Sequence, residues 1–153
     1  MDYEIIAKYV MFLTENLKEI EFGLNELEDK NLSKRVKDLL KKSLERLAEE
    51  VIECATKIND LILFEENIDF DSYYDSFKNL SLIEFFKDNL EFFEKIASSA
   101  GFRNRLAQDY LDLDERITMV TIRRLPKLYK DYLILIQEYL VDLQEKEEQE
   151  SKK

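Results

Sequence analysis

The stretch that decides the fold is an amphipathic repeat, DYEIIAKYVMFLTENLKEIEFGLNELE, at residues 2–28. Its apolar side chains recur every three to four residues, at Ile5, Ile6, Tyr9, Phe12, Leu13, Leu17, Ile20, Leu24 and Leu27. This spacing gathers them on one side of an α-helix and leaves the charged side chains on the other. The sequence therefore predicts a long first helix that packs one face against the rest of the protein.

A second stripe of the same period follows after a short polar break. Its apolar members are Val36, Leu39, Leu40, Leu44, Leu47, Val51, Ala55, Ile58 and Ile62, and the pattern ends near Glu66. Either Asn31 or Ser33 can cap this helix, because a side-chain oxygen can accept from its free amides. Two long helices on a short connection predict an antiparallel hairpin. Cys54 lies within the second stripe, where we expect a small core residue.

The pattern changes at NIDFDS, residues 67–72, which we interpret as a crossing loop. Beyond it, the pairs Phe85/Phe86 and Phe92/Phe93 lie one heptad apart, so a continuous helix would turn both to the same side. Core packing is the default explanation for these rings, and a subunit interface is the alternative.

The last third of the chain restarts the helical period, with Asp114 as a plausible cap. Because proline lacks an amide donor and fits best in a first turn, Pro126 predicts a short helix ending near Arg124 and a new helix starting at the proline. The final residues, QEKEEQESKK at 144–153, contain no apolar side chain and predict a charged, disordered tail.

Composition agrees with one all-α domain over residues 1–143, an antiparallel up-down bundle of about five helices. The 153 residues include only two glycines and one proline, so hairpins and glycine-rich phosphate loops have little material. A lone cysteine excludes an intrachain disulfide and fits a reducing compartment. No apolar run reaches the length of a membrane span and no secretion signal opens the chain, so we expect a cytoplasmic protein without membrane contact.

Charge is unevenly distributed along the chain. The net charge of −11 opposes non-specific binding to nucleic acid. Residues 101–130 nevertheless carry seven Lys or Arg against four Asp or Glu. At helical spacing Arg103 and Tyr110 share one arc, with Asn104 and Gln108 beside it. These polar groups are either exposed or line a site.

The segment AGFRNRLAQDYLDLD, residues 100–114, resembles the signature of HepT-like members of the HEPN superfamily, whose motif reads R-N-x-L-x-H-x-Y. The upstream SYYDSFKNL and the LP dipeptide of the last helix also resemble segments of that family. The resemblance implies a helical homodimer that joins two motifs in one cleft. It also implies a toxin that cleaves RNA without a metal or other cofactor.

Within that family mechanism, Arg103 would bind the scissile phosphate through its fork of donors, and Asn104 would orient neighbouring groups. The motif tyrosine, Tyr110 here, is the residue on which a partner minimal nucleotidyltransferase of the MNT type attaches AMP. A bulky anionic AMP beside Arg103 would block the phosphate site. Without the family, Arg103 could instead pair with Asp109 or with a carboxylate of a neighbouring helix.

Gln108 stands where the family has its catalytic histidine, and the chain has no histidine at any position. An amide hydrogen-bonds but does not transfer protons at neutral pH, so we expect impaired cleavage. The chain is then either a degenerate homologue or a deliberately inactivated toxin. Two functions remain open: an impaired ribonuclease toxin, and a non-catalytic helical dimer that binds RNA or its nucleotidyltransferase partner. An unrelated metal-binding bundle has little support without histidines.

Overall fold

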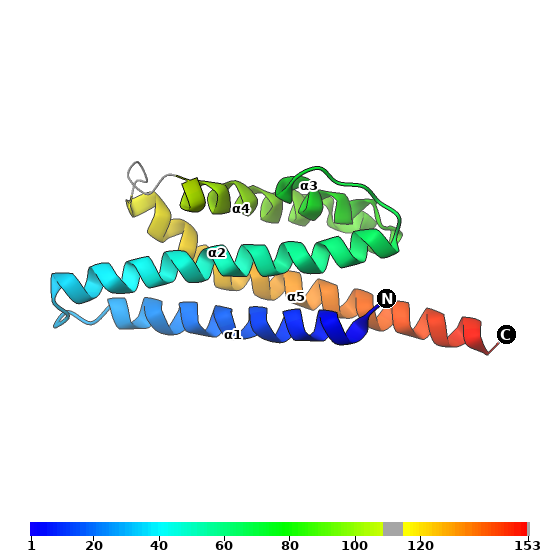
Figure 1. The fold of residues 1–153 in the computed structure, drawn as a ribbon, viewed down its shortest axis with the longest axis horizontal. Coiled ribbons are helices and arrows are strands. Elements are labelled where there is room, and N and C mark those ends of the chain that lie inside the picture. Colours follow the sequence, from blue (N-terminus) through cyan, green and yellow to red (C-terminus); the bar gives the residue numbers. More distant parts are fainter. Residues whose placement is uncertain (109–114, 153) are drawn as a thin grey trace.

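The first amphipathic repeat forms helix α1, Tyr3–Leu27, in the computed structural model, which describes residues 1–108 and 115–152. The second repeat forms α2, Lys34–Glu65, where the Ser33 hydroxyl accepts from the Val36 amide and so caps the helix. The two helices lie side by side and run in opposite directions (Figure 1). The predicted helical hairpin is confirmed, and Cys54 is buried in its core.

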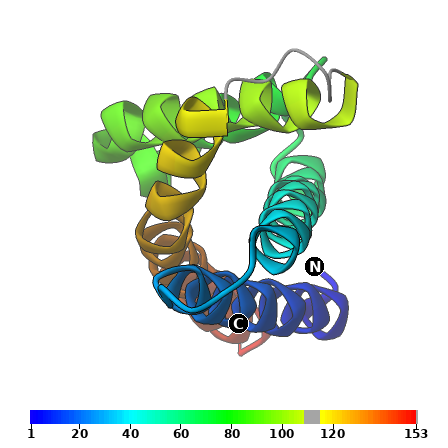
Figure 2. The same cartoon turned by 90° about the vertical axis from the view of Figure 1, so that its left-hand side faces the viewer.

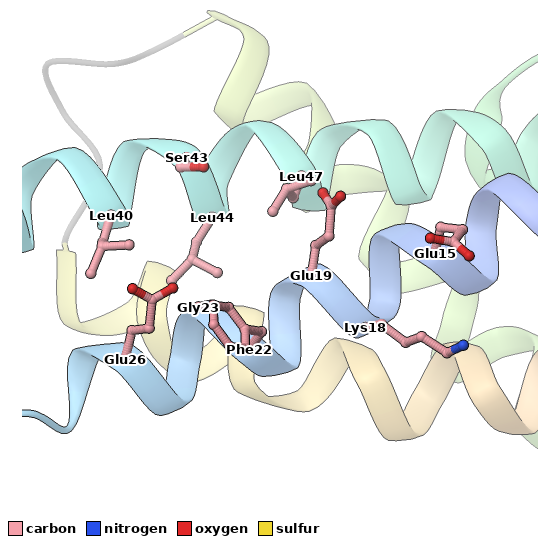
Figure 3. A pocket seen from close by; sticks show the side chains of 10 residues that line it. All are labelled: Glu15, Lys18, Glu19, Phe22, Gly23, Glu26, Leu40, Ser43, Leu44 and Leu47. Atoms are coloured by element: carbon pink, nitrogen blue, oxygen red, sulfur yellow. The ribbon is translucent and has the colours of Figure 1, made fainter.

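Gly23 lets α1 and α2 approach closely near one end of the hairpin. A β-carbon built on Gly23 would lie 2.8 Å from Cδ2 of Leu44, closer than real side chains come. Beside this contact the helices form a groove, whose apolar members Phe22, Leu44 and Leu47 lie between acidic side chains (Figure 3). The missing side chain thus leaves room for the buried Leu44 side chain against α1.

The elements that follow the loop at 67–72 form a third layer, which covers α2. Helix α3 spans Tyr73–Lys78, the 3₁₀ turns η1 and η2 span Asn79–Leu82 and Glu84–Asn89, and α4 spans Leu90–Gln108. The prediction of one continuous helix through the phenylalanine pairs is wrong. Short polar side chains bond the backbone here instead: the Ser81 hydroxyl donates to the Lys78 carbonyl at 2.6 Å, and such bonds compete with helix formation.

Each phenylalanine pair is divided between core and surface, because consecutive residues of a helix point in different directions. Phe86 and Phe93 are fully buried and their ring centroids lie 5.0 Å apart. Phe85 is exposed, and Phe92 is only partly buried against the core. Core packing therefore explains one member of each pair, and a subunit interface over the others stays a prediction.

The last helix, α5, spans Glu115–Ser151 and contains Pro126 within it. The predicted break between Arg124 and Pro126 is wrong, and the proposed cap at Asp114 lies outside the described residues. An internal proline costs roughly 3 kcal/mol, which burial of Leu125, Tyr129 and neighbouring core residues of α5 offsets. The first turns of α5 are tilted against the remainder, as expected where a proline interrupts the helical hydrogen bonds (Figure 2).

The acidic end of α5 also differs from the expectation of a disordered tail, because the helix continues through residues 144–151. The Tyr3 hydroxyl of α1 donates to the Glu147 carboxylate at 2.8 Å. Lys146 pairs with Asp142, one turn earlier, at 3.1 Å. These contacts tie the last turns to α1 and to each other, although they bury little apolar surface.

The core brings α2, α4 and α5 together through two buried tyrosines. Tyr132 donates its hydroxyl to Oδ1 of Asn59 on α2, 2.5 Å away, and Tyr129 shares a 2.6 Å hydrogen bond with Ser99 on α4. Burial raises the pKa of both phenols, which therefore stay neutral. The described residues form an all-α antiparallel bundle without strands, as predicted, and none of their helices is both long and apolar enough to span a membrane.

Candidate active site

Arg103 lies on the face of α4 that packs against α2. Its neighbours Phe102 and Leu106 are buried and anchor this part of α4 in the core. The Arg103 guanidinium contacts the Glu53 carboxylate directly, and its Nη2 lies 3.7 Å from Oε1 of Glu49. Because the two glutamates are four residues apart, α2 presents both on one face.

A third partner of Arg103 comes from α3. The guanidinium lies over the ring of Tyr73, with its carbon 5.1 Å from the ring centroid, a cation–π geometry. The arginine side chain is 19% exposed, and its Nε is buried without a hydrogen-bond partner among the described residues. Three elements therefore hold Arg103 at a partly open edge of the bundle.

The electrostatics of this edge keep the arginine charged. Burial opposes the charge, but the hydrogen bond to Glu53, together with the negative charges around it, outweighs burial and raises the pKa of Arg103. Glu53 is 39% exposed and Glu49 is 26% exposed, so solvent reaches both carboxylates. A phosphate that approaches Arg103 would meet these two acids as competitors for the same donors.

The other predicted site residues are only partly placed. Asn104 adjoins Arg103 on α4 and is exposed. The backbone of Gln108 is described as the last residue of α4, whereas its side chain lies outside the description. Tyr110 lies outside the described residues. The site thus joins Arg103 and Asn104 on one helix, and whether Gln108 and Tyr110 complete it stays a prediction.

Of the two expectations for Arg103, its pairing with carboxylates of a neighbouring helix is confirmed, and its role toward phosphate stays a prediction. Sequence reasoning did not identify Glu49, Glu53 or Tyr73 as its partners. The spacing of the two glutamates was a usable signal, since it places two acids on one face of an otherwise apolar-striped helix. The signal did not indicate which basic residue they would meet.

The groove between the first two helices is less suited to phosphate than the edge around Arg103. The groove between α1 and α2 carries Glu15, Glu19 and Glu26 against one cation, Lys18 (Figure 3). Such an acidic rim repels an anion. Among residues 1–108 and 115–152, no group of acidic or cysteine side chains is arranged to hold a metal ion. The edge around Arg103, which carries Arg103 and Asn104 of the motif, is the candidate active site.

Comparison with known families agrees with the helical bundle. A search of curated proteins finds no match. A family model described as "Ribonuclease HepT-like" matches residues 13–136, which include most of α1, all of α2 to α4, and α5 as far as Ile136. The match contains Arg103 and Asn104 and spans most of the chain, so this protein belongs to the HepT-like ribonuclease family.

Proposed function

We propose that this chain is the toxin component of a toxin–antitoxin pair, with a phosphate-binding site for RNA at Arg103 and impaired cleavage. The observation that carries the proposal is the charged, partly exposed Arg103 guanidinium within the family match. A guanidinium offers a planar fork of donors that fits two oxygens of a phosphate. Asn104, exposed beside it, adds an amide that can hydrogen-bond the RNA backbone.

Cleavage of RNA by attack of the ribose 2′-hydroxyl requires a group that accepts and donates protons. The chain has no histidine, and Gln108 stands at the motif position where the family carries one. An amide leaves the phosphate bound but moves no proton, so the step loses the roughly 10²- to 10⁴-fold acceleration that a general acid or base supplies. We therefore infer a protein that binds RNA and cleaves it slowly.

Assembly and control complete the proposal. A homodimer would bring two copies of the Arg103 edge together, and the exposed Phe85 offers apolar surface for such contact. A minimal nucleotidyltransferase partner would silence the toxin by attaching AMP to Tyr110. The added negative charge would then compete with RNA for Arg103, in addition to the Glu53 carboxylate that contacts the guanidinium.

Gln108→His tests the function, because it returns a side chain whose pKa lies near neutrality. We expect RNA hydrolysis without added metal to rise by about two orders of magnitude or more. Arg103→Ala in the Gln108→His background should remove the gain, since the phosphate loses its bidentate partner. Asn31→His, at an exposed loop distant in sequence from the motif, is the matched control and should gain no activity.

The alternative is a non-catalytic helical dimer that binds RNA or its nucleotidyltransferase partner. It becomes the better description if Gln108→His folds, dimerises and binds RNA as the parent does but cleaves no faster. Growth arrest on expression of Gln108→His, relieved by Arg103→Ala, would instead support the toxin.

A further inference from the structure

Basic side chains gather at the end of the bundle where α2 and α5 begin, although the chain as a whole is acidic. Residues 34–46 of α2 include six Lys or Arg and two Asp or Glu. Residues 115–130 of α5 include five Lys or Arg and one acid, Glu115. Figure 2 views this end of the molecule, with the first turns of both helices toward the viewer. The adjoining end of α1 has the opposite sign, with five acids and one lysine over residues 15–28.

A concave pocket lies between these two basic segments, and we call it the α2–α5 pocket. Its cationic lining consists of Lys37 and Lys41 from α2 and Arg116 and Arg123 from α5. Glu115 is the one acid in the lining. Four cations from two helices that are far apart in sequence thus converge on one hollow.

The described ion pairs leave much of this charge uncompensated. Lys41 pairs with Glu115 at 2.5 Å. Lys37 and Arg123 form no ion pair within residues 1–108 and 115–152, and Arg123 is exposed. A second acid, Glu45, lies close to Glu115: burial, followed by the charge of Glu115, raises the pKa of Glu45. These two acids oppose an anion near Lys41, but the four cations of the lining outnumber its one acid, so the pocket as a whole favours an anion.

We propose that the α2–α5 pocket binds the phosphate backbone of an RNA strand and anchors it for the Arg103 site, an inference that rests on the proposed function. Lys37 and Arg123 provide the free charges, and Lys41 joins them when phosphate displaces Glu115. Contacts to phosphate position a nucleic acid without reading its sequence, which suits a surface built from cations.

The place of the pocket relative to Arg103 supports a continuous path for one strand. The first turns of α2 and α5, which line the pocket, lie toward the same end of the bundle as the motif segment of α4 (Figure 1). Along α2, Lys41 and Glu53 are twelve residues apart, a separation of about 18 Å at 1.5 Å per residue. A short single strand bridges such a distance, so one RNA could contact both sites.

RNA binding by the parent, measured by fluorescence anisotropy with a single-stranded RNA oligonucleotide over a range of salt concentrations, tests the proposal. Lys37→Gln/Arg123→Gln should weaken binding about tenfold at low salt. It should also lower the slope of log affinity against log salt by about 1.4, which is roughly 0.7 for each of two lost phosphate contacts. Glu115→Gln should tighten binding, because it releases Lys41.

Lys18→Gln/Lys146→Gln is the matched control, since it removes the same charge from the acidic α1–α2 groove and from the far end of α5. The control should bind RNA nearly as the parent does. Equal weakening in both double variants, or weaker binding by Glu115→Gln, overturns the proposal. So does displacement of RNA by polyglutamate at equal charge concentration, which would assign the pocket to an acidic protein.

The outcomes separate this inference from the proposed function. If Gln108→His cleaves RNA equally well with and without Lys37→Gln/Arg123→Gln, and binding is also unchanged, the pocket proposal fails while the ribonuclease stands. If the parent binds no RNA at low salt, the pocket proposal fails too, and cleavage by Gln108→His then decides the function by itself.

Discussion

If Arg103 binds phosphate as proposed, Glu53 competes for the same guanidinium, so Glu53→Gln should strengthen RNA binding while it weakens the fold. The carboxylate contacts the guanidinium directly, and the two side chains are 39% and 19% exposed. At about 4 Å and an effective dielectric constant near 20, two unit charges attract by about 4 kcal/mol. Solvent at this edge and the desolvation of both groups reduce the net value to about 1 kcal/mol, as for other exposed pairs.

A phosphate that displaces Glu53 must overcome that 1 kcal/mol, which corresponds to about a fivefold loss of affinity. Glu53→Gln removes the competing charge but keeps the size of the side chain. We therefore expect RNA to bind about fivefold more tightly, measured by fluorescence anisotropy at constant salt. The free energy of unfolding in urea should fall by about 1 kcal/mol, because the arginine loses its strongest partner.

Glu50→Gln supplies the control, because it makes the same change of charge on the same helix, where Glu50 pairs only with the exposed Arg46 among the described residues. Any gain common to both variants comes from the reduced negative charge of the protein. In the Arg103→Ala background the specific effect of Glu53→Gln should vanish. If Glu53→Gln binds RNA no better than Glu50→Gln, then Glu53 orients the guanidinium for phosphate and does not compete with it.

Three further predictions concern the bundle that holds this site. Gly23→Val should destabilise the fold by about 1–3 kcal/mol in thermal or urea unfolding, because the new side chain meets Leu44. Tyr132→Phe should cost about 1–3 kcal/mol in the same assay, because it leaves the buried Asn59 without its donor. Burial raises the pKa of Cys54 to about 11, so the native thiol should react with iodoacetamide at least 100-fold more slowly than the unfolded chain at pH 8. Its contribution to stability should be complete below about pH 9 and lost as the pH rises through 11, because the raised pKa favours the protonated thiol in the folded state.

The long helices could be predicted because their signals are local and agree with one another. The stripes of α1 and α2 repeat over many turns, and Ser33 caps α2 through a bond within its own first turn. A long amphipathic helix needs only a partner surface of any kind to be stable, so the tertiary context changes its ends but not its existence.

The errors fall where tertiary contacts decide between two local possibilities. Pro126 disfavours a continuous helix, yet the buried residues on both sides of it hold α5 together. The acidic end of α5 has no apolar stripe, yet Tyr3 of the first helix bonds Glu147. In each case the deciding partner lies far away in sequence, where periodicity gives no information.

The candidate site shows the same division between local and distant information. Arg103 and Asn104 are neighbours, so the motif alone places them together on α4. The Glu49, Glu53 and Tyr73 partners come from other elements, and only the folded chain brings them to the guanidinium. A motif identifies the residues that carry the chemistry, whereas the fold determines what competes for them.

Net charge is an equally poor guide to what this molecule binds, because its charges are separated in space. The acids of α1 line the α1–α2 groove, whereas cations of α2 and α5 line the α2–α5 pocket at the end of the bundle. At an ionic strength near 0.15 M, electrostatic effects decay over about 8 Å, so an RNA strand at the pocket responds mainly to the charges near it. The overall charge of −11 governs how a nucleic acid approaches from greater distances, and it matters most at low salt, where screening is weak. A protein with this arrangement can therefore repel nucleic acid as a whole and still hold one strand, if Arg103 and the pocket bind phosphate as proposed.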